Sequence, residues 1–371
     1  MKKLLGFILI IVGVGLLIFF WQRIDSPTGN TSSTTTDEPT TTTPTASTTS
    51  STEPEIIQSN LRVPWEIVFL PDGDMLVTER AGVLKRFGKT NANIKIDGVR
   101  QAGEGGLLGM VLHPDFEKNN FVYLYFTTSN LTNKVVRYKL GAESLAEPQT
   151  IIENIPGANN HDGGRIAFGP DNKLYITTGD AQVESRAQDT NSLAGKLLRL
   201  NDDGSTPSDN PFNNAVYSYG HRNPQGLGWD KDGQLWATEH GRSGSQTGLD
   251  ELNLIEKGKN YGWPVIQGDQ TKPGMETPKQ NSGPTTTWAP ADIAIVGNVL
   301  YFSGLRGESL YQTTLDGQSA AKLTANFAKQ YGRIRALAIH DGYLYFSTSN
   351  QDGRGSPRPN DDKIYRFKID Q

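Results

Sequence analysis

The sequence predicts an all-β protein, a six-bladed β-propeller preceded by an N-terminal transmembrane helix and a disordered linker. Three observations lead to this prediction. The 371 residues include 40 Gly and 20 Pro and show few long helical patterns, which is typical of many short strands joined by turns. Short apolar runs separated by Asp-Gly turns recur along the chain. One long apolar run lies at the start of the chain.

Residues 1–24 are predicted to form a signal anchor, a transmembrane helix. The run Leu4–Trp21 contains 18 apolar or glycine residues, which span about 27 Å as a helix, close to the hydrocarbon thickness of a bilayer. No Ala-x-Ala-like cleavage site follows, so we expect a retained anchor and not a cleaved signal peptide. Lys2 and Lys3 favour a cytoplasmic N-terminus, which places the rest of the chain on the extracytoplasmic side, in the periplasm or at the cell surface.

Residues 25–55 are predicted to form a disordered linker. From Ser26 to Thr52, 19 of 27 residues are Ser or Thr with Pro between them. This composition buries too little apolar area to offset the entropy lost on ordering. The propeller domain is therefore predicted to occupy residues 56–371.

The sequence predicts six strand-turn-strand units after the linker. The first has strands at Trp65–Leu70, Met75–Thr78 and Val83–Phe87 around the turn 71–73, and the second begins at Leu108. Asp-Gly and Asp-Asn between apolar runs are turn chemistry, because these residues tolerate positive φ. A β-sandwich would also use short strands, but it would not repeat the same turns six times, so a propeller is favoured. The remaining units begin near Ile166, Leu227, Ile293 and Ala336.

Charge and cysteine content exclude some classes of function. The net charge of −4 and the isoelectric point near 5.8 give no basic surface, so a nucleic-acid partner is not expected. The chain has no Cys, which excludes disulfides, thiolate metal sites and a cysteine nucleophile.

Two polar, glycine-flanked loops point to a binding site. The first combines the segment 161–165 (His-Asp-Gly-Gly-Arg) with Gly179-Asp180, and the second is the segment 220–226 (Gly-His-Arg-Asn-Pro-Gln-Gly). Propellers carry their sites on loops around the central channel. These loops therefore predict a site there for a polar, anionic ligand.

Several motifs, in order and through all six units, resemble the soluble aldose sugar dehydrogenases. That family contains pyrroloquinoline quinone (PQQ) enzymes related to soluble glucose dehydrogenase. The resemblance extends from about Ile57 to Asp370. The motifs are 103–109 (Gly-Glu-Gly-Gly-Leu-Leu-Gly), 113–116 (His-Pro-Asp-Phe), 161–165, 179–180, 192–196 (Ser-Leu-Ala-Gly-Lys), 220–226, 250–253 (Asp-Glu-Leu-Asn) and 260–264 (Asn-Tyr-Gly-Trp-Pro).

The resemblance implies a cofactor with three carboxylates and an ortho-quinone that accepts a hydride. Arginines suit such a ligand because the guanidinium is a planar fork that matches a carboxylate. Glu104 stands where soluble glucose dehydrogenases have glutamine, which favours the broader aldose group; its carboxylate would need a proton, an ion or an arginine partner beside the cofactor. The cofactor-binding residues implied are Glu104, His161, Arg222, Asn223, Arg306, Arg333 and Arg335.

The catalytic residues that the resemblance implies are His161, Asp180 and Arg222. Oxidation of a sugar hydroxyl needs a base for its proton, and an imidazole has a suitable pKa. His161 is the expected base. Asp180 is expected to hold the other ring nitrogen, and Arg222 to polarise the quinone oxygen.

The family also uses calcium (Ca²⁺), a cation that prefers oxygen ligands. The resemblance implies that carbonyl groups of Gly241 and Arg242 bind the cofactor-associated ion, although Arg242 stands where the glucose enzymes have proline. A separate ion is implied at Glu251 and Tyr261, the latter through its carbonyl.

The resulting hypothesis is a membrane-tethered enzyme that oxidises the C1 hydroxyl of aldose sugars to lactones with PQQ and calcium. Electrons would pass to an external acceptor. Two alternatives remain: a calcium-dependent lactone hydrolase, and a non-catalytic sugar-binding propeller on a stalk. The fold alone does not separate these functions.

Overall fold

The computed structural model describes residues 53–242 and 247–369. The predicted anchor, and the predicted linker up to residue 52, lie outside the described residues. Within the described ranges no helix has the length and apolar character needed to cross a membrane. The helices in this part are α1 (Phe116–Asn119) and the short 3₁₀-helix η1 (Glu184–Gln188).

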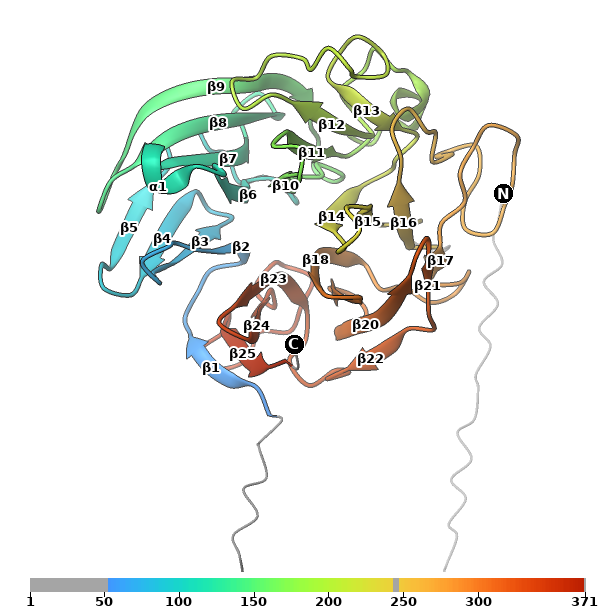
Figure 1. Cartoon of the computed structure of the whole chain (residues 1–371). Helices are drawn as coiled ribbons and strands as arrows, with labels where there is room; N and C mark the ends of the chain where they lie inside the picture. The colour runs from blue at the N-terminus through green and yellow to red at the C-terminus, as the bar shows by residue number, and fades with distance from the viewer. Residues whose placement is uncertain (1–52, 243–246, 370–371) are drawn as a thin grey trace, which may run out of the picture. The chain divides into compact units, whose positions relative to one another are not determined.

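The described residues form six antiparallel sheets, the blades, arranged in a ring (Figure 1). The strands of blades 1 to 3 are β2 (Pro64–Phe69), β3 (Met75–Glu79), β4 (Val83–Phe87) and β5 (Ala92–Lys95); β6 (Leu107–Leu112), β7 (Phe121–Thr127), β8 (Thr132–Leu140) and β9 (Leu145–Pro156); β10 (Ile166–Phe168), β11 (Leu174–Thr178), β12 (Lys196–Leu200) and β13 (Val216–Tyr219). The strands of blades 4 to 6 are β14 (Pro224–Trp229), β15 (Leu235–Glu239), β16 (Glu251–Ile255) and β17 (Gln280–Asn281); β18 (Pro290–Val296), β19 (Val299–Gly304), β20 (Ser309–Asp316), β21 (Ser319–Ala320) and β22 (Thr324–Asn326); β23 (Ile334–His340), β24 (Tyr343–Thr348), β25 (Ile364–Lys368) and β1 (Glu55–Gln58).

The prediction of an all-β, six-bladed propeller is confirmed. In blades 1 to 5 the first strand in the chain lies innermost. In blade 6 the innermost strand is β23, and the outermost strand, β1, comes from the start of the domain. There β1 pairs with β25, with Glu55 opposite Arg366, which closes the ring (Figure 1). The sequence predicts three strands in each unit. The structure adds a fourth, outer strand to each blade, and a fifth to blade 5, where both β21 and β22 pair with β20.

The apolar core lies between neighbouring blades. At the seam between blades 6 and 1, for example, Ile67 and Val77 pack against Ala336 and Ile364. Period-2 patterns place such side chains on the sheet faces, so each blade buries its faces against its neighbours. The ring therefore holds the ends of all six inner strands close to one axis.

A buried charged cluster joins several blades at the inner strands. Arg165, just before β10, donates its Nε to the carbonyl of Gln225 at 2.9 Å, and its Nη1 contacts Glu66 and, at 3.2 Å, Asp292. The guanidinium also lies 4.2 Å from the ring of Trp65. Two buried carboxylates thus share one guanidinium, and Arg165 is a structural residue of the ring.

Burial raises the pKa of Glu66 from its ordinary value of 4.5 to about 8, against the opposing charge of Arg165. The folded state therefore binds this proton more tightly than the unfolded state does. Its stabilising contribution is complete below about pH 4.5 and is lost as the pH rises through about 8. Glu66→Gln, which keeps an oxygen for Arg165, should flatten the fall in Tm between about pH 5 and 8. Thermal unfolding of both proteins across this range measures the effect, and identical slopes would contradict it.

Candidate active site

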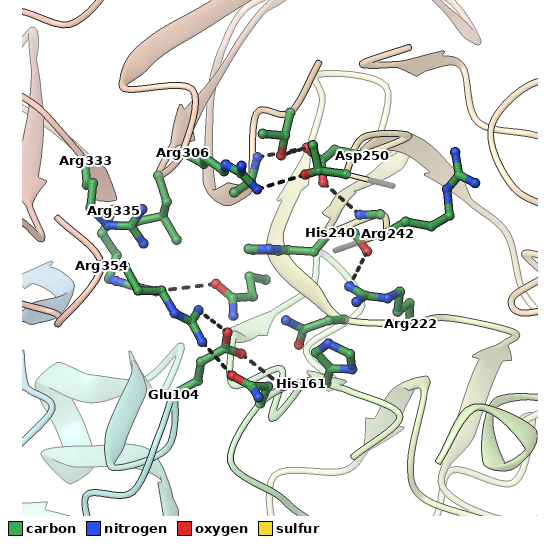
Figure 2. Close-up of a pocket in the computed structure, with 18 of the residues that line it drawn as sticks. Glu104, His161, Arg222, His240, Arg242, Asp250, Arg306, Arg333, Arg335 and Arg354 are labelled. Atoms are coloured by element: carbon green, nitrogen blue, oxygen red, sulfur yellow. Dashed lines mark hydrogen bonds and ion pairs between the residues drawn. The ribbon is translucent and has the colours of Figure 1, made fainter. Parts of the chain in front are cut away.

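A cavity of about 460 Å³ lies where the loops at one end of the inner strands converge (Figure 2). Two kinds of loop supply its lining. Loops that precede an inner strand contribute His161, Arg222 and Arg333, and loops that follow the second strand of a blade contribute His240 and Arg306. Adjacent antiparallel strands run in opposite directions, so both kinds of loop meet at the same end of the ring.

Asp180 holds the ring of His161, and Trp263 holds Asp180. Its Nδ1 lies 2.7 Å from Asp180 Oδ1, and Asp180 Oδ2 accepts a hydrogen bond from Trp263 Nε1 at 2.9 Å. Asp180 is fully buried, whereas His161 lines the cavity. A Cβ on Gly179 would lie 1.9 Å from the carbonyl oxygen of His161, so the close approach of the two loops requires glycine there. The geometry leaves Nε2 of the ring available to accept a proton.

Among the described residues, six arginines line the cavity (Figure 2). Two of them enter from the start of β23: Arg333 bonds Asp352 at 2.8 Å, and Arg335 lies 3.4 Å from the side-chain oxygen of Gln225. The carboxylates that line the same cavity are Glu104 and Asp250. The site therefore carries an excess of positive charge. The six arginines are Arg222, Arg242, Arg306, Arg333, Arg335 and Arg354.

Burial of this charge changes the acidity of several groups. Burial lowers the pKa of Arg335 to about 9, and the nearby guanidinium groups of Arg80 and Arg333 act in the same direction. Burial likewise lowers the pKa of Arg222 and lowers that of His240 to about 4. The cations are crowded and partly desolvated, so an anion bound among them would relieve their repulsion.

Glu104 and Asn223 line the cavity and also hold the loop that carries His161. Glu104 Oε2 accepts the backbone N–H of His161 at 2.9 Å, and Asn223 Oδ1 accepts that of Gly163 at 3.0 Å. Burial alone would raise the pKa of Glu104, but two positive groups outweigh it and lower that pKa to about 2: His240, which is charged in the acid range where Glu104 titrates, and Arg354, which also bonds the carboxylate. Glu104 is thus an ionised carboxylate with an arginine partner, one of the conditions expected for it beside an anionic ligand.

The four residues predicted as metal ligands fall into two neighbouring places. Gly241 and Arg242 line the large cavity. Glu251 and Tyr261 line a small second cavity of about 10 Å³, which Gly241 also borders. No group of three or more His, Cys, Asp or Glu side chains suited to a metal is found in residues 53–242 and 247–369. Any ion there would depend on carbonyl and amide oxygens as well as on carboxylates.

Comparison with known proteins identifies the family. The sequence profile described as Glucose / Sorbosone dehydrogenase matches residues 61–356. The chain belongs to this family. It is 31% identical over 349 residues to the aldose sugar dehydrogenase YliI of Escherichia coli (strain K12), across 82% of this chain and 92% of that protein. The predicted family and the prediction of an oxidoreductase are confirmed.

Two further relatives support the assignment to the glucose/sorbosone dehydrogenase family. Quinoprotein glucose dehydrogenase B of Acinetobacter calcoaceticus is 35% identical over 257 residues, which cover 58% of this chain and 53% of that protein. The solved PQQ-bound aldose sugar dehydrogenase of Streptomyces coelicolor is 38% identical with a TM-score of 0.79, and the match covers 85% of this chain and 98% of that one.

The cavity residues fit the quinone cofactor found in that relative. The cavity volume lies within the usual range of small-molecule sites, roughly 300 to 1,000 Å³. The arginine lining is suited to a ligand with several carboxylates. His240 Nε2 is buried and has no hydrogen-bond partner among the described residues, so it offers a polar contact to a ligand. Both charge and hydrogen-bonding capacity therefore match a planar, anionic ligand.

Sequence reasoning missed three of the ionisable residues that line the cavity of this glucose/sorbosone dehydrogenase family member: His240, Asp250 and Arg354. His240 follows β15 as Gly179-Asp180 follow β11, so the repeat itself contained a signal for it. Asp250 fixes the lining through backbone N–H groups, which include those of Gly241 at 2.8 Å and Trp288 at 2.6 Å. Arg354 lies in an irregular loop with no pattern that would reveal it.

His221, which belongs to one of the two polar loops, does not line the cavity. Its ring is fully buried, lies 2.8 Å from Glu239 Oε2 and 2.9 Å from the hydroxyl of Ser218, and stacks on Tyr261. Glu239 also accepts the backbone N–H of Arg222. His221 therefore supports the loop that presents Arg222 and Asn223.

Proposed function

We propose that the protein oxidises the C1 hydroxyl of aldose sugars to lactones with PQQ and calcium and passes the electrons to an external acceptor. The observation that carries the proposal is the meeting of His161–Asp180 with six arginines of the described chain in one cavity. A base and an anion site side by side match the needs of sugar oxidation by a carboxylated quinone.

His161 acts as the base in this proposal. Its Nδ1–H is donated to Asp180, which fixes the tautomer and stabilises the imidazolium that forms. Nε2 then takes the proton of the C1 hydroxyl as the hydride leaves C1. The hydrogen bond from Trp263 to Asp180 keeps this carboxylate in place.

The bound quinone would supply the oxidant that takes up the hydride. Arg333 and Arg335 are proposed to bind its carboxylates, together with Arg306. Glu104 and Asn223 are proposed to contact the cofactor from neighbouring loops. Arg222 is proposed to place positive charge at the quinone oxygen; its guanidinium lies 5.3 Å from the ring of Trp263, which keeps it beside the His161–Asp180 pair. Because this positive charge is already in place before the reaction, the site needs no reorganisation when negative charge develops on the quinone oxygen.

Calcium is proposed to bind at the two places named above. Carbonyl oxygens of Gly241 and Arg242 would serve the cofactor-associated ion, and Glu251 with the carbonyl of Tyr261 would serve the separate one. Burial raises the pKa of Glu251 to about 8, and the charge of Glu239 adds to this effect. Gln267 Oε1 borders the same small cavity and is buried without a partner among the described residues. This oxygen is available to coordinate a cation, which supports the proposed ion site.

Calcium should raise the Tm of the wild-type protein relative to protein in chelator, by a few degrees, because an ion that binds only the folded state stabilises it. Glu251→Gln should abolish most of the difference, since it removes the carboxylate proposed to bind calcium. Glu239, the other carboxylate of the small cavity, is bonded to His221 and to the N–H of Arg222. Differential scanning calorimetry of both proteins, with calcium and with chelator, measures the effect. An equal calcium response in both would remove Glu251 from the proposed ligands.

The anchor at residues 1–24 and the extracytoplasmic location belong to the same proposal. The composition of the N-terminal segment supports them. Protease added to intact spheroplasts should cleave the domain from the membrane if this orientation is correct.

The proposed activity is tested by sugar-dependent reduction of an artificial dye. The full chain is purified in detergent, stripped of cofactor and metal with chelator, and assayed with PQQ and calcium added together or singly. Dye reduction is expected only when the quinone is present. Hydrolysis of lactones without dye reduction would support the hydrolase alternative, and binding of sugars without either reaction would support the non-catalytic one.

A further inference from the structure

We propose that Arg354 is a positioning residue: acting through Glu104, it holds the main chain of His161 in the conformation that faces the cavity. This inference rests on the proposed function, in which His161 is the base. It assigns a role to an arginine that sequence reasoning missed, and it gives Glu104 a role beyond contact with the cofactor.

Glu104 uses its two carboxylate oxygens for different partners. Oε2 accepts the backbone N–H of His161 at 2.9 Å, and Oε1 pairs with Nη1 of Arg354 (Figure 2). The backbone N–H of Glu104 in turn donates to the carbonyl of Asn159 at 2.8 Å. Glu104 therefore holds both sides of the short segment 159–161.

The backbone conformation of His161 depends on contacts of this kind. Its φ is +66°, in the left-handed region that residues other than glycine seldom adopt. Such a conformation is strained, and a residue keeps it only when its surroundings fix it. Asp180 fixes the ring, and Glu104 fixes the amide. Without the second contact, the ring would remain bonded while the main chain that carries it could relax.

Arg354 is itself attached to the rigid part of the ring. Its backbone N–H donates to Asp352 Oδ1 at 2.9 Å, and Asp352 pairs with Arg333 at 2.7 Å. Its Nη2 also contacts the side-chain oxygen of Asn160. One guanidinium thus holds Glu104 and the neighbour of His161 together. The loop of blade 6 that follows β24 reaches the loop that precedes β6 in blade 2.

The burial of Glu104 separates this pair from an ordinary surface ion pair, which contributes little to stability. The Arg354 side chain is 53% exposed, but that of Glu104 is only 16% exposed. The pair joins two loops at the cavity and lies outside the apolar faces packed between neighbouring blades, so its loss should affect the overall stability little. Its effect should instead be seen at the amide of His161 and in catalysis. These two readouts distinguish a positioning role from a merely structural one.

The first test uses the protein without cofactor or sugar. Amide hydrogen exchange of the segment 157–165 is measured by mass spectrometry in the wild type, Arg354→Met and Arg354→Lys. Arg358→Met is the matched control, because Arg358 lies in the same loop but contacts carbonyls of Gln330 and Lys329. We expect exchange in this segment to be about tenfold faster in Arg354→Met, intermediate in Arg354→Lys and unchanged in Arg358→Met. Equal exchange in all four proteins would overturn the proposal.

The second test uses the enzyme loaded with PQQ and calcium. Arg354→Met should lower kcat by about 10- to 100-fold, the range expected when a reacting group is misplaced, while KM and PQQ affinity change by no more than a few-fold. The double variant Glu104→Gln/Arg354→Met should be no slower than Glu104→Gln alone, because both substitutions interrupt the same series of contacts from Arg354 through Glu104 to His161. Lost PQQ affinity with unchanged kcat would instead make Arg354 a cofactor ligand. If the wild type oxidised no sugar, the proposed function would fail, and the exchange experiment would still decide the role of Arg354.

Discussion

His161→Ala is expected to lower kcat by about two to four orders of magnitude, the usual contribution of a positioned general base. The affinity for PQQ should stay nearly unchanged, because the arginines that bind its carboxylates remain. Dye-reduction kinetics and a PQQ titration on the same preparation measure both quantities. The loss should appear in kcat more than in KM, since proton removal belongs to the chemical step.

His340→Ala is the matched control for this substitution. His340 stacks on Phe69 at a ring-centroid distance of 4.1 Å and does not line the cavity, so its removal should leave kcat unchanged. If His161→Ala unfolded the protein, Asp180→Asn would carry the test, because it alters the tautomer of His161 and keeps the shape of the side chain. A kcat within a few-fold of wild type in His161→Ala would show that another group is the base.

Arg222→Gln is expected to lower kcat by about 10²- to 10³-fold, which is typical when one group that stabilises developing charge is removed. The substitution removes positive charge from the cavity, but it leaves the backbone N–H that Glu239 accepts. Arg222→Lys should recover part of the rate, because it restores the charge without the planar fork. Steady-state kinetics of the three proteins at saturating PQQ measure the effect.

A suitable control for Arg222→Gln is Arg366→Gln. Arg366 lies on β25 and pairs with Glu55 near the outer edge of blade 6, outside the cavity. Its substitution should leave kcat unchanged. If Arg222→Gln lost PQQ affinity while kcat at saturation stayed at the wild-type value, Arg222 would bind the cofactor without assisting the chemistry.

The fold was predictable from the sequence because its signals are local. The turn at Pro71-Asp72-Gly73 separates two apolar runs, and the predicted strand Trp65–Leu70 differs from β2 by one residue at each end. The outer strands were not predictable in the same way. β17 has only two residues, and β1 is fixed by pairing with β25 some 300 residues away, which no local pattern records.

Residues of the candidate site were predictable where a motif contained them. The segments 161–165 and 220–226 carry His161, Arg222 and Asn223 with their flanking glycines, and all three residues line the cavity. Arg354 was not predictable, because its partner Glu104 is 250 residues away in the chain. The division of the expected metal ligands between two cavities also depends on how separate loops pack, which spacing alone does not specify.

The most direct test of the central claim is a calorimetric titration of PQQ into the purified, cofactor-free protein at low and high salt. An arginine-lined cavity that binds a tricarboxylate predicts saturable binding at one site per chain, with an affinity that falls as salt rises and falls further in Arg333→Met. The absence of saturable binding, or an affinity that neither salt nor Arg333→Met changes, would contradict the account.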